Sequence, residues 1–330
     1  MPSTPITEHS GGTAQLADAH RPNSLLLGAS LVLILLLWSV NYTAAKIALR
    51  HMSPLTLAPL RIDLAAVLML AVYFTRRERA RFQRRDFWTF AYLAFLGVVL
   101  NQGCFMVGLG YTTSGRSVLV KAVGPILILV LARAMGLEKF TTPKIVGMAL
   151  AFCGVMLLET EGGTVGHTPA VIGDAITFVS TMGFAVYSVL GKRVLNASRM
   201  GRYDAISLNA FITLGAGIMV LPLAVQQGIV LDWKSVGWAG WGAMGYMSLG
   251  SSVGAYTLFY WVLKHLDASR VAAINYIQPF LVIILSMLFL GEHPTGHLIS
   301  GGVLVLVGVY FVERVSSGGA RLQGSEGPAA

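Results

Sequence analysis

The sequence predicts an all-α, polytopic membrane protein with ten transmembrane helices in two inverted five-helix repeats. The first observation is composition: 55% of the 330 residues are hydrophobic and 12% are charged, about half the charged fraction of a soluble domain. The second is the recurrence of apolar stretches near the ~20 residues that one helix needs to cross a bilayer. The third is that the second half of the chain repeats the first.

Ten apolar stretches are long enough to cross a membrane. We expect helices because isolated strands leave backbone groups unpaired in lipid, and because the alternation of apolar and polar residues that marks a barrel is missing. The expected spans are residues 25–47, 54–74, 87–109, 114–135, 142–158, 171–191, 204–224, 236–260, 269–290 and 297–313.

Loop charge predicts the orientation of the spans. Residues 76–85 contain six arginines, and residues 192–202 contain four basic residues. The alternate loops at 159–169 and 291–297 contain no lysine or arginine. Cytoplasmic loops retain basic residues, so we expect both basic loops, and with ten crossings both termini, on the cytoplasmic side. The arginine run is short and lies between two spans, so no nucleic-acid partner is expected.

Composition and repetition divide the chain into five segments. We expect a disordered cytoplasmic tail at 1–23, a first five-helix repeat at 24–159, an external linker at 160–169, a second five-helix repeat at 170–314 and a disordered cytoplasmic tail at 315–330. The tails are polar and rich in small residues, a composition that buries too little apolar surface to fold.

Residues from the fourth and fifth spans recur in the ninth and tenth at one constant spacing. Because five is an odd number of crossings, the second copy enters the membrane from the opposite side, and a pseudo-two-fold axis in the membrane plane relates the halves. Secondary transporters with such inverted repeats bind substrate near the midplane between the halves. The residue pairs that lie 154 apart are Arg116 and Arg270, Pro125 and Pro279, Glu138 and Glu292, Gly147 and Gly301, and Gly154 and Gly308.

Several motifs between about Leu25 and Arg314 resemble those of the EamA-type transporters of the drug/metabolite transporter superfamily. Besides the doubled unit and the Pro-to-Glu spacing, they are "WSVNYTAAK" in the first span, "SPLTLAPLR" opening the second, and "IGDAITFVSTMGFAVYSVLGKR" opening the second repeat. The resemblance implies a ten-helix basket in a bacterial inner membrane that exports amino acids or related metabolites. Small multidrug members of the superfamily carry a membrane Glu in their first helix. This first span has none, which argues against proton-coupled export of cationic drugs.

Two prolines mark the expected substrate site. Without an N–H, Pro125 and Pro279 free the carbonyls four residues earlier, at Lys121 and Asn275. A free carbonyl at membrane depth needs surrounding protein or a wet cavity, and Gln278 shares a helix face with Asn275. We therefore expect Lys121, Asn275 and Gln278 to line a central polar cavity and bind substrate. The alternative is that the prolines only kink their helices.

Other mid-span residues extend this candidate site. Asn101 and Gln102 lie in the middle of the third span and either hydrogen-bond a ligand or join helices. Candidate aromatic walls, each of which alternatively packs or lies at a membrane interface, are Trp38, Tyr187, Tyr256, Tyr260 and Trp261.

Asp63 is the acidic candidate in this site. It lies about 10 Å into the second span, on a different face from Arg61, and needs a partner such as Lys46 or Arg116. Asp63 either binds a substrate ammonium, carries a coupling proton or forms a structural ion pair. We expect Arg116 to be an interfacial anchor, with the alternative that it helps to draw an anionic group inward, and Asp174 to cap the start of the sixth helix.

These features predict a secondary transporter and not an enzyme. It is expected to export small polar metabolites, amino acids or related zwitterions, by alternating access. Rival substrates are organic anions, sugars and nucleotide-sugars. The rival classes are an integral-membrane enzyme and a non-transporting scaffold. The sequence contains no P-loop, helical HExxH or recognisable nucleophile–base spacing, and a scaffold has little reason to carry polar residues at symmetric proline breaks.

The expected partners are a small-molecule substrate and the lipid bilayer. A proton or another ion is the candidate coupling ion, and the assembly is a monomer or a homodimer. No catalytic residue or cofactor is expected. No metal site is expected either, because Pro294 lies between His293 and His297 and no further ligand is nearby in the sequence. The expected location is the inner (plasma) membrane.

Overall fold

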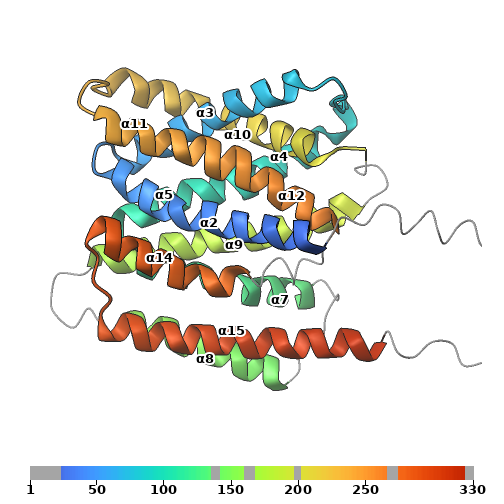
Figure 1. The fold of residues 1–330 in the computed structure, drawn as a ribbon, viewed down its shortest axis with the longest axis vertical. Helices are drawn as coiled ribbons and strands as arrows, with labels where there is room; N and C mark the ends of the chain where they lie inside the picture. The colour runs from blue at the N-terminus through green and yellow to red at the C-terminus, as the bar shows by residue number, and fades with distance from the viewer. Residues whose placement is uncertain (1–23, 135–141, 160–167, 197–201, 266–273, 324–330) are drawn as a thin grey trace, which may run out of the picture.

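The computed structural model of the chain describes residues 24–134, 142–159, 168–196, 202–265 and 274–323, which form a stack of helices (Figure 1). The all-α fold with several membrane spans is therefore confirmed, while the count of ten crossings stays a prediction. Within the described residues, five runs are long and apolar enough to cross a membrane: Leu25–Leu49, Pro54–Thr75, Arg84–Tyr111, Pro169–Leu190 and Ala205–Val230. Shorter apolar helices are Ile145–Gly154, Ile277–Leu290 and Gly296–Gly308.

The two halves share their order of helices, except that the fourth span of the first half is broken into α6 and α7, whereas its counterpart α14 continues through Pro279. In each half, the third of its five predicted spans (the third and the eighth along the chain) is interrupted by a π-helical segment. The first half contains α2 (Ser24–Leu49), α3 (Pro54–Thr75), the 3-10 turn Arg84–Asp86, α4 (Phe87–Ala94), the π segment Phe95–Leu100, α5 (Asn101–Tyr111), α6 (Ser114–Ala122), α7 (Gly124–Ala134) and α8 (Thr142–Glu159). The second half contains α9 (Thr168–Asn196), α10 (Ala205–Val230), α11 (Gly237–Tyr246), the π segment Met247–Ala255, α12 (Tyr256–His265), α14 (Ile274–Leu290) and α15 (Gly296–Gln323).

Local sequence sets several helix ends. Ser53 caps α3 by accepting a hydrogen bond from the Thr56 N–H at 3.2 Å, and Pro54 follows at the first helical position. The fourth predicted span breaks at Val123, two residues before Pro125, so that α6 and α7 are separate helices. Gly291 ends α14 at φ +68°, a left-handed conformation that glycine adopts without steric cost.

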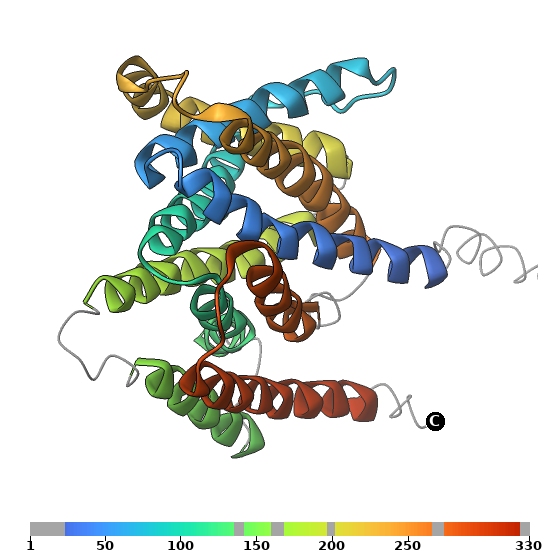
Figure 2. The same ribbon diagram turned by 60° about the vertical axis from the view of Figure 1, so that its left-hand side comes forward.

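The pairing of α8 with α15 follows the sequence repeat. A Cβ added at Gly154 would lie 2.7 Å from the carbonyl oxygen of Gly301, and one at Gly308 would lie 2.4 Å from that of Gly147. Exchanging each glycine for its repeat partner converts the first contact into the second, as a two-fold axis between the helices requires. Small residues let membrane helices approach this closely. The pair lies at one end of the stack in both views (Figures 1 and 2).

The α3–α10 pair lies at the other end of the stack, and it also joins two counterpart helices from the two halves (Figure 1). Between these ends, α5 packs on α9, and α2 packs on α14 and on the second π segment. The start of α2 and the end of α15 lie on the same side of the stack (Figure 1).

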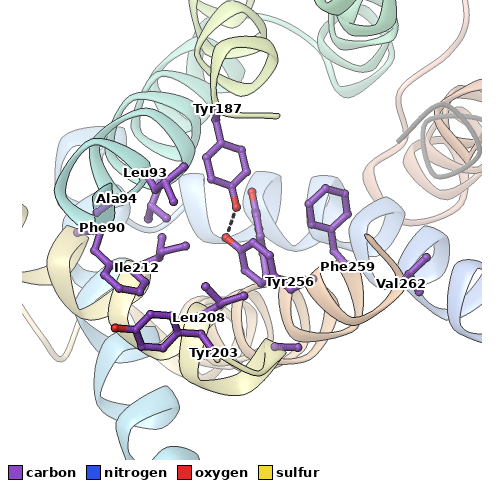
Figure 3. Packing of buried hydrophobic residues seen from close by; sticks show 14 of the residues in the cluster. Phe90, Leu93, Ala94, Tyr187, Tyr203, Leu208, Ile212, Tyr256, Phe259 and Val262 are labelled. Carbon is purple, nitrogen blue, oxygen red and sulfur yellow. Dashed lines mark hydrogen bonds between the residues drawn. The ribbon is translucent and has the colours of Figure 1, made fainter. Parts of the chain in front are cut away.

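An aromatic cluster fills one part of the space between the halves. It includes Phe90, Tyr187, Tyr203, Tyr256 and Phe259, all less than 9% exposed. The hydroxyl of Tyr187 on α9 hydrogen-bonds that of Tyr260 on α12, and Figure 3 shows Tyr187 pointing toward the rings of α12. This cluster borders the candidate site described next, because Tyr256 belongs to both.

Candidate functional site

A cavity of about 90 Å³ lies between the two halves. That is room for several water-sized groups. Its polar lining comes from both halves of the chain, and no carboxylate is found among the described lining residues. The lining comprises Trp38, Asn41 and Tyr42 of α2, Arg61 of α3, Asn101, Gln102 and Phe105 of α5, Val118, Lys121 and Ala122 of α6, Gly124 and Ile128 of α7, Thr181 and Phe184 of α9, Ser251 and Tyr256 of the eighth predicted span, and Gln278 of α14.

Most of the predicted site residues meet in this cavity. Lys121, Gln278, Asn101, Gln102, Tyr256 and Trp38 all line it. Asn275 lies in the first turn of α14, and its side chain falls outside the part of the chain that is described. The cavity thus brings six of the eight predicted residues together, while their role in binding substrate stays a prediction.

Lys121 lies at the end of α6, two residues before the break at Val123 and four before Pro125. Its Nζ donates to Asn101 Oδ1 and to Ser180 Oγ, both at 3.0 Å, and lies 5.1 Å from the ring centroid of Phe105. All of these partners are neutral. The ammonium is therefore held in place without a counter-charge from the described residues.

Asn101 connects Lys121 to the other half of the molecule. Its Nδ2 donates to the Gly97 carbonyl and to the Tyr256 hydroxyl, both at 3.2 Å. Ser180 Oγ donates to the Asn101 backbone carbonyl at 2.6 Å. Asn101 is thereby fixed on several sides, as a residue that positions a ligand-binding group must be.

Both π segments end next to cavity residues. Phe95–Leu100 directly precedes Asn101, and Met247–Ala255 contains Ser251 and directly precedes Tyr256. A π turn rotates the following residues around the helix axis relative to an unbroken α-helix, and such turns are frequent at functional sites. The position of these residues on the cavity side depends on this rotation.

Trp38 and Tyr256 form an aromatic wall. Their ring centroids are 5.5 Å apart at an angle of 65°, an edge-to-face pair, and Trp38 also packs on Phe259 at 5.5 Å. Tyr187, Tyr260 and Trp261 were further candidate walls, and the described cavity lining does not include them.

Arg61 is the functional candidate that reasoning from sequence left unassigned. Its side chain is 2% exposed and lines the cavity. Its Nη2 donates to Gln102 Oε1 at 2.9 Å and to Ser252 Oγ at 3.4 Å, whereas its Nε has no hydrogen-bond partner among the described residues. The available signal was that a charged residue deep in a membrane span rarely lacks a functional reason.

Asn41 is a second residue that the sequence did not single out. It lines the cavity, and its Oδ1 is a buried acceptor without a hydrogen-bond partner in the described ranges. Buried polar groups are almost always paired. An unpaired amide oxygen in a cavity is therefore suited to a ligand donor.

Asp63 does not join the predicted site. The described lining excludes it, and its Oδ1 would lie 3.0 Å from a Cβ added at Gly217, so it faces α10. The two partners suggested for it are engaged elsewhere: Lys46 donates to the Thr112 carbonyl, and Arg116 pairs with Asp174. Two residues apart on one helix, Arg61 and Asp63 take different directions, as their spacing predicts.

Two predictions about the ends of helices were wrong. Arg116 is not an interfacial anchor, because it is 8% exposed and its Nε donates to Asp174 Oδ2 at 2.9 Å. Asp174 does not cap its helix, because α9 already begins at Thr168. Asp174 Oδ1 also accepts from the Thr112 hydroxyl at 2.7 Å. These residues form a buried ion pair that joins α6 to α9.

Metal-binding residues do not gather in the part of the chain that the structure covers. Within the described ranges, no three side chains of His, Cys, Asp or Glu lie close enough together to hold a metal ion. His293 and His297 are both exposed.

Comparison with known proteins agrees with this arrangement. A model of the EamA-like transporter family matches residues 26–160 and 171–314. An "Uncharacterized transporter" of Archaeoglobus fulgidus is 27% identical over 286 residues, covering 85% of this chain and 95% of that protein. A "Probable amino-acid metabolite efflux pump" of Escherichia coli is 25% identical, covering 86% and 93%. One known crystal structure, 17% identical, shares the fold with a TM-score of 0.62 over 89% of this chain and 99% of that one.

Proposed function

The chain belongs to the EamA-like transporter family, and on that premise we propose that it is a secondary transporter that exports amino acids or related zwitterions by alternating access. The observation that carries the proposal is the cavity between the halves, in which the partners of Lys121 among the described residues are all neutral. A transporter must bind and then release its substrate, and a Lys121 ammonium that no described carboxylate pairs is suited to a contact that forms only while substrate is bound.

Lys121 binds the substrate carboxylate in this proposal. A charged hydrogen bond between an ammonium and a carboxylate is about twice as strong as a neutral one. Replacing the neutral oxygens of Asn101 and Ser180 by a carboxylate thus favours the bound state. Gln278, which has no hydrogen bond within the described residues, supplies a further polar contact.

Asn41 and the aromatic wall bind the substrate ammonium. The unpaired Oδ1 of Asn41 accepts one N–H, and the faces of Trp38 and Tyr256 attract positive charge. This assignment replaces the expected role of Asp63, which is absent from the described lining. The relatives named as amino-acid metabolite efflux pumps support a substrate of this class.

The proposed location is the inner membrane with both termini in the cytoplasm. The start of α2, the end of α15 and the arginine-rich segment 76–85 lie on one side of the stack (Figure 1), which supports this orientation through the retention of basic loops in the cytoplasm. Export, coupling to a proton or another ion, and assembly as a monomer or homodimer complete the proposal.

Transport into proteoliposomes tests the function. The purified chain is reconstituted, and uptake of labelled amino acids and sugars is measured with and without a pH gradient. We expect saturable uptake of amino acids, lowered at least about tenfold by Lys121→Ala because one charged hydrogen bond is lost. Lys234→Ala is the matched control, because Lys234 lies exposed in the loop between α10 and α11. Normal uptake by Lys121→Ala would remove the cavity from the mechanism, and flux of no compound by a folded protein would reject the transporter.

A further inference from the structure

The cavity contains a second cation that the proposed carboxylate contact leaves unused. We propose that Arg61 binds a second anionic group, so that the site selects small metabolites with two carboxylates, of which an acidic amino acid is the simplest. This inference rests on the proposed transport function and narrows its substrate class.

Arg61 carries a permanent charge in a buried place. Its guanidinium keeps its proton at every physiological pH, and its side chain is 2% exposed. Its hydrogen-bond partners are Gln102 Oε1 at 2.9 Å, Ser252 Oγ at 3.4 Å and the Met106 sulfur at 3.7 Å. All three are neutral, and Nε has no partner in the described part of the chain. A buried charge without a counter-charge is unfavourable, so this site is incomplete without an anion.

Two adjacent amides hold the two cations. Asn101 Oδ1 accepts from Lys121, and Gln102 Oε1 accepts from Arg61. An aspartate and a glutamate at these positions would have the same shapes and would neutralise both cations. The amides orient the cations and leave both charges available to a ligand.

Arg116 shows how this protein pairs a buried arginine that has a purely structural role. Arg116 is also buried, and it is paired with the carboxylate of Asp174. Arg61 and Lys121 line the cavity, and no described carboxylate lies within ion-pair distance of either. Charge pairing is therefore present away from the cavity and missing inside it, which points to a ligand as the missing partner.

Arg61 also lies where the two halves meet. Its guanidinium bonds Ser252 and its backbone carbonyl accepts from the Ser248 hydroxyl at 3.0 Å, and both serines belong to the π segment of the second half. An anion bound to Arg61 thus acts on a contact between the halves. This position suits a group that couples substrate binding to their relative movement.

Matched substrates test the charge preference directly. Glutamate and glutamine, or aspartate and asparagine, differ by one charge at almost constant shape. In proteoliposomes, we expect the acidic member to be taken up with a kcat/KM at least about tenfold above the neutral amide, the factor that one charged hydrogen bond is worth. A neutral partner carried equally well or better overturns the inference, while the transport function stands. If neither acidic nor neutral compounds move, the transport function itself fails.

Three variants separate the charge of Arg61 from its packing. Arg61→Gln removes the cation and is expected to abolish the preference. Gln102→Glu keeps Arg61 but places a carboxylate beside it that neutralises its charge, so this variant is also expected to abolish the preference for the acidic substrate. Arg61→Lys keeps the charge and is expected to retain a preference. Arg81→Gln is the control, because Arg81 is exposed in the loop between α3 and α4.

A binding measurement covers the case in which a variant does not transport. Stabilisation against heat in detergent is measured with glutamate and with glutamine. We expect glutamate to stabilise the native chain more than glutamine, and Gln102→Glu to remove that difference. Equal stabilisation of the native chain by both ligands, or an unchanged glutamate preference in Gln102→Glu, overturns the role of Arg61.

Discussion

The buried ion pair between Arg116 and Asp174 predicts a large cost for Asp174→Asn. Asp174 is 4% exposed and accepts from Arg116 Nε at 2.9 Å and from the Thr112 hydroxyl at 2.7 Å. Breaking a buried pair by removing one partner costs about 3–5 kcal/mol, because the remaining charge stays buried. Asparagine keeps one acceptor oxygen, so we expect about 3 kcal/mol.

A surface pair in the same protein supplies the control. The side chains of Arg76 and Asp204 are 36% and 40% exposed. Exposed ion pairs contribute below about 1 kcal/mol, so Arg76→Gln is expected to change stability by no more than that. The assay is unfolding by sodium dodecyl sulfate in mixed micelles, followed by tryptophan fluorescence, with the free energy taken from the midpoint and slope.

The double variant Arg116→Met/Asp174→Leu completes the test. Replacing a buried ion pair by apolar residues of similar size is often neutral or stabilising, so we expect most of the stability lost in Asp174→Asn to return. If Asp174→Asn costs no more than Arg76→Gln, the pair is not buried in the way described, and the reasoning is refuted.

Three further outcomes are expected. Gly154→Ala should destabilise the protein by about 1–3 kcal/mol through overpacking against Gly301. Gly28→Ala is the control and should not destabilise it, because a Cβ added at Gly28 meets nothing within 4 Å. Equal effects of the two variants in the same unfolding assay would count against the close α8–α15 contact. Pro125→Ala should let α6 and α7 join and lower uptake without lowering the unfolding midpoint, and unchanged uptake would show that the break does not position Lys121. Burial raises the pKa of the Tyr203 phenol, so the hydroxyl stays protonated and donates to Asp86 Oδ2 at 2.8 Å. Tyr203→Phe should lower the free energy of unfolding by about 1.5–3 kcal/mol. A change near zero would contradict that hydrogen bond.

Features encoded along the chain were predictable from the sequence. The break near Pro125 follows from the missing N–H of proline, and α6 does end at Ala122. The repeat spacing matched Gly147 with Gly301 and Gly154 with Gly308 along the sequence, and in the structure Gly154 approaches Gly301 while Gly308 approaches Gly147. Lys121 was placed in the cavity because Pro125 frees its carbonyl, and Gln278 because it shares a helix face with Asn275; both residues line the cavity.

Features that depend on which helices touch were not predictable in the same way. Asp174 was expected to cap a helix that starts near residue 171, whereas α9 already begins at Thr168. Its pairing with Arg116 requires that α6 lie against α9, and the sequence contains no local signal for that contact. Long-range ion pairs join residues far apart in the chain, here 58 positions.

The direction of a side chain around its helix was the other limit. The spacing of Arg61 and Asp63 predicted different faces, but not which face meets the cavity. A helix that is apolar on most sides has no stripe to identify its inner face, and the π segments rotate Asn101 and Tyr256 in a way that an ideal helical period does not predict. Arg61 was consequently left unassigned, and Asp63 was assigned to a site that it does not reach.

Thiol labelling at position 181 tests most directly whether substrate enters the cavity between the halves. Cys104 and Cys153 are first replaced by serine, and Thr181→Cys is introduced as the sole thiol, because Thr181 lines the cavity and is assigned no substrate contact. We expect a small, membrane-impermeant methanethiosulfonate to react from at least one side of the membrane, and glutamate at saturating concentration to slow that reaction at least about tenfold. A thiol at position 181 that reacts from neither side, or at a rate that no amino acid changes, would contradict a central substrate site.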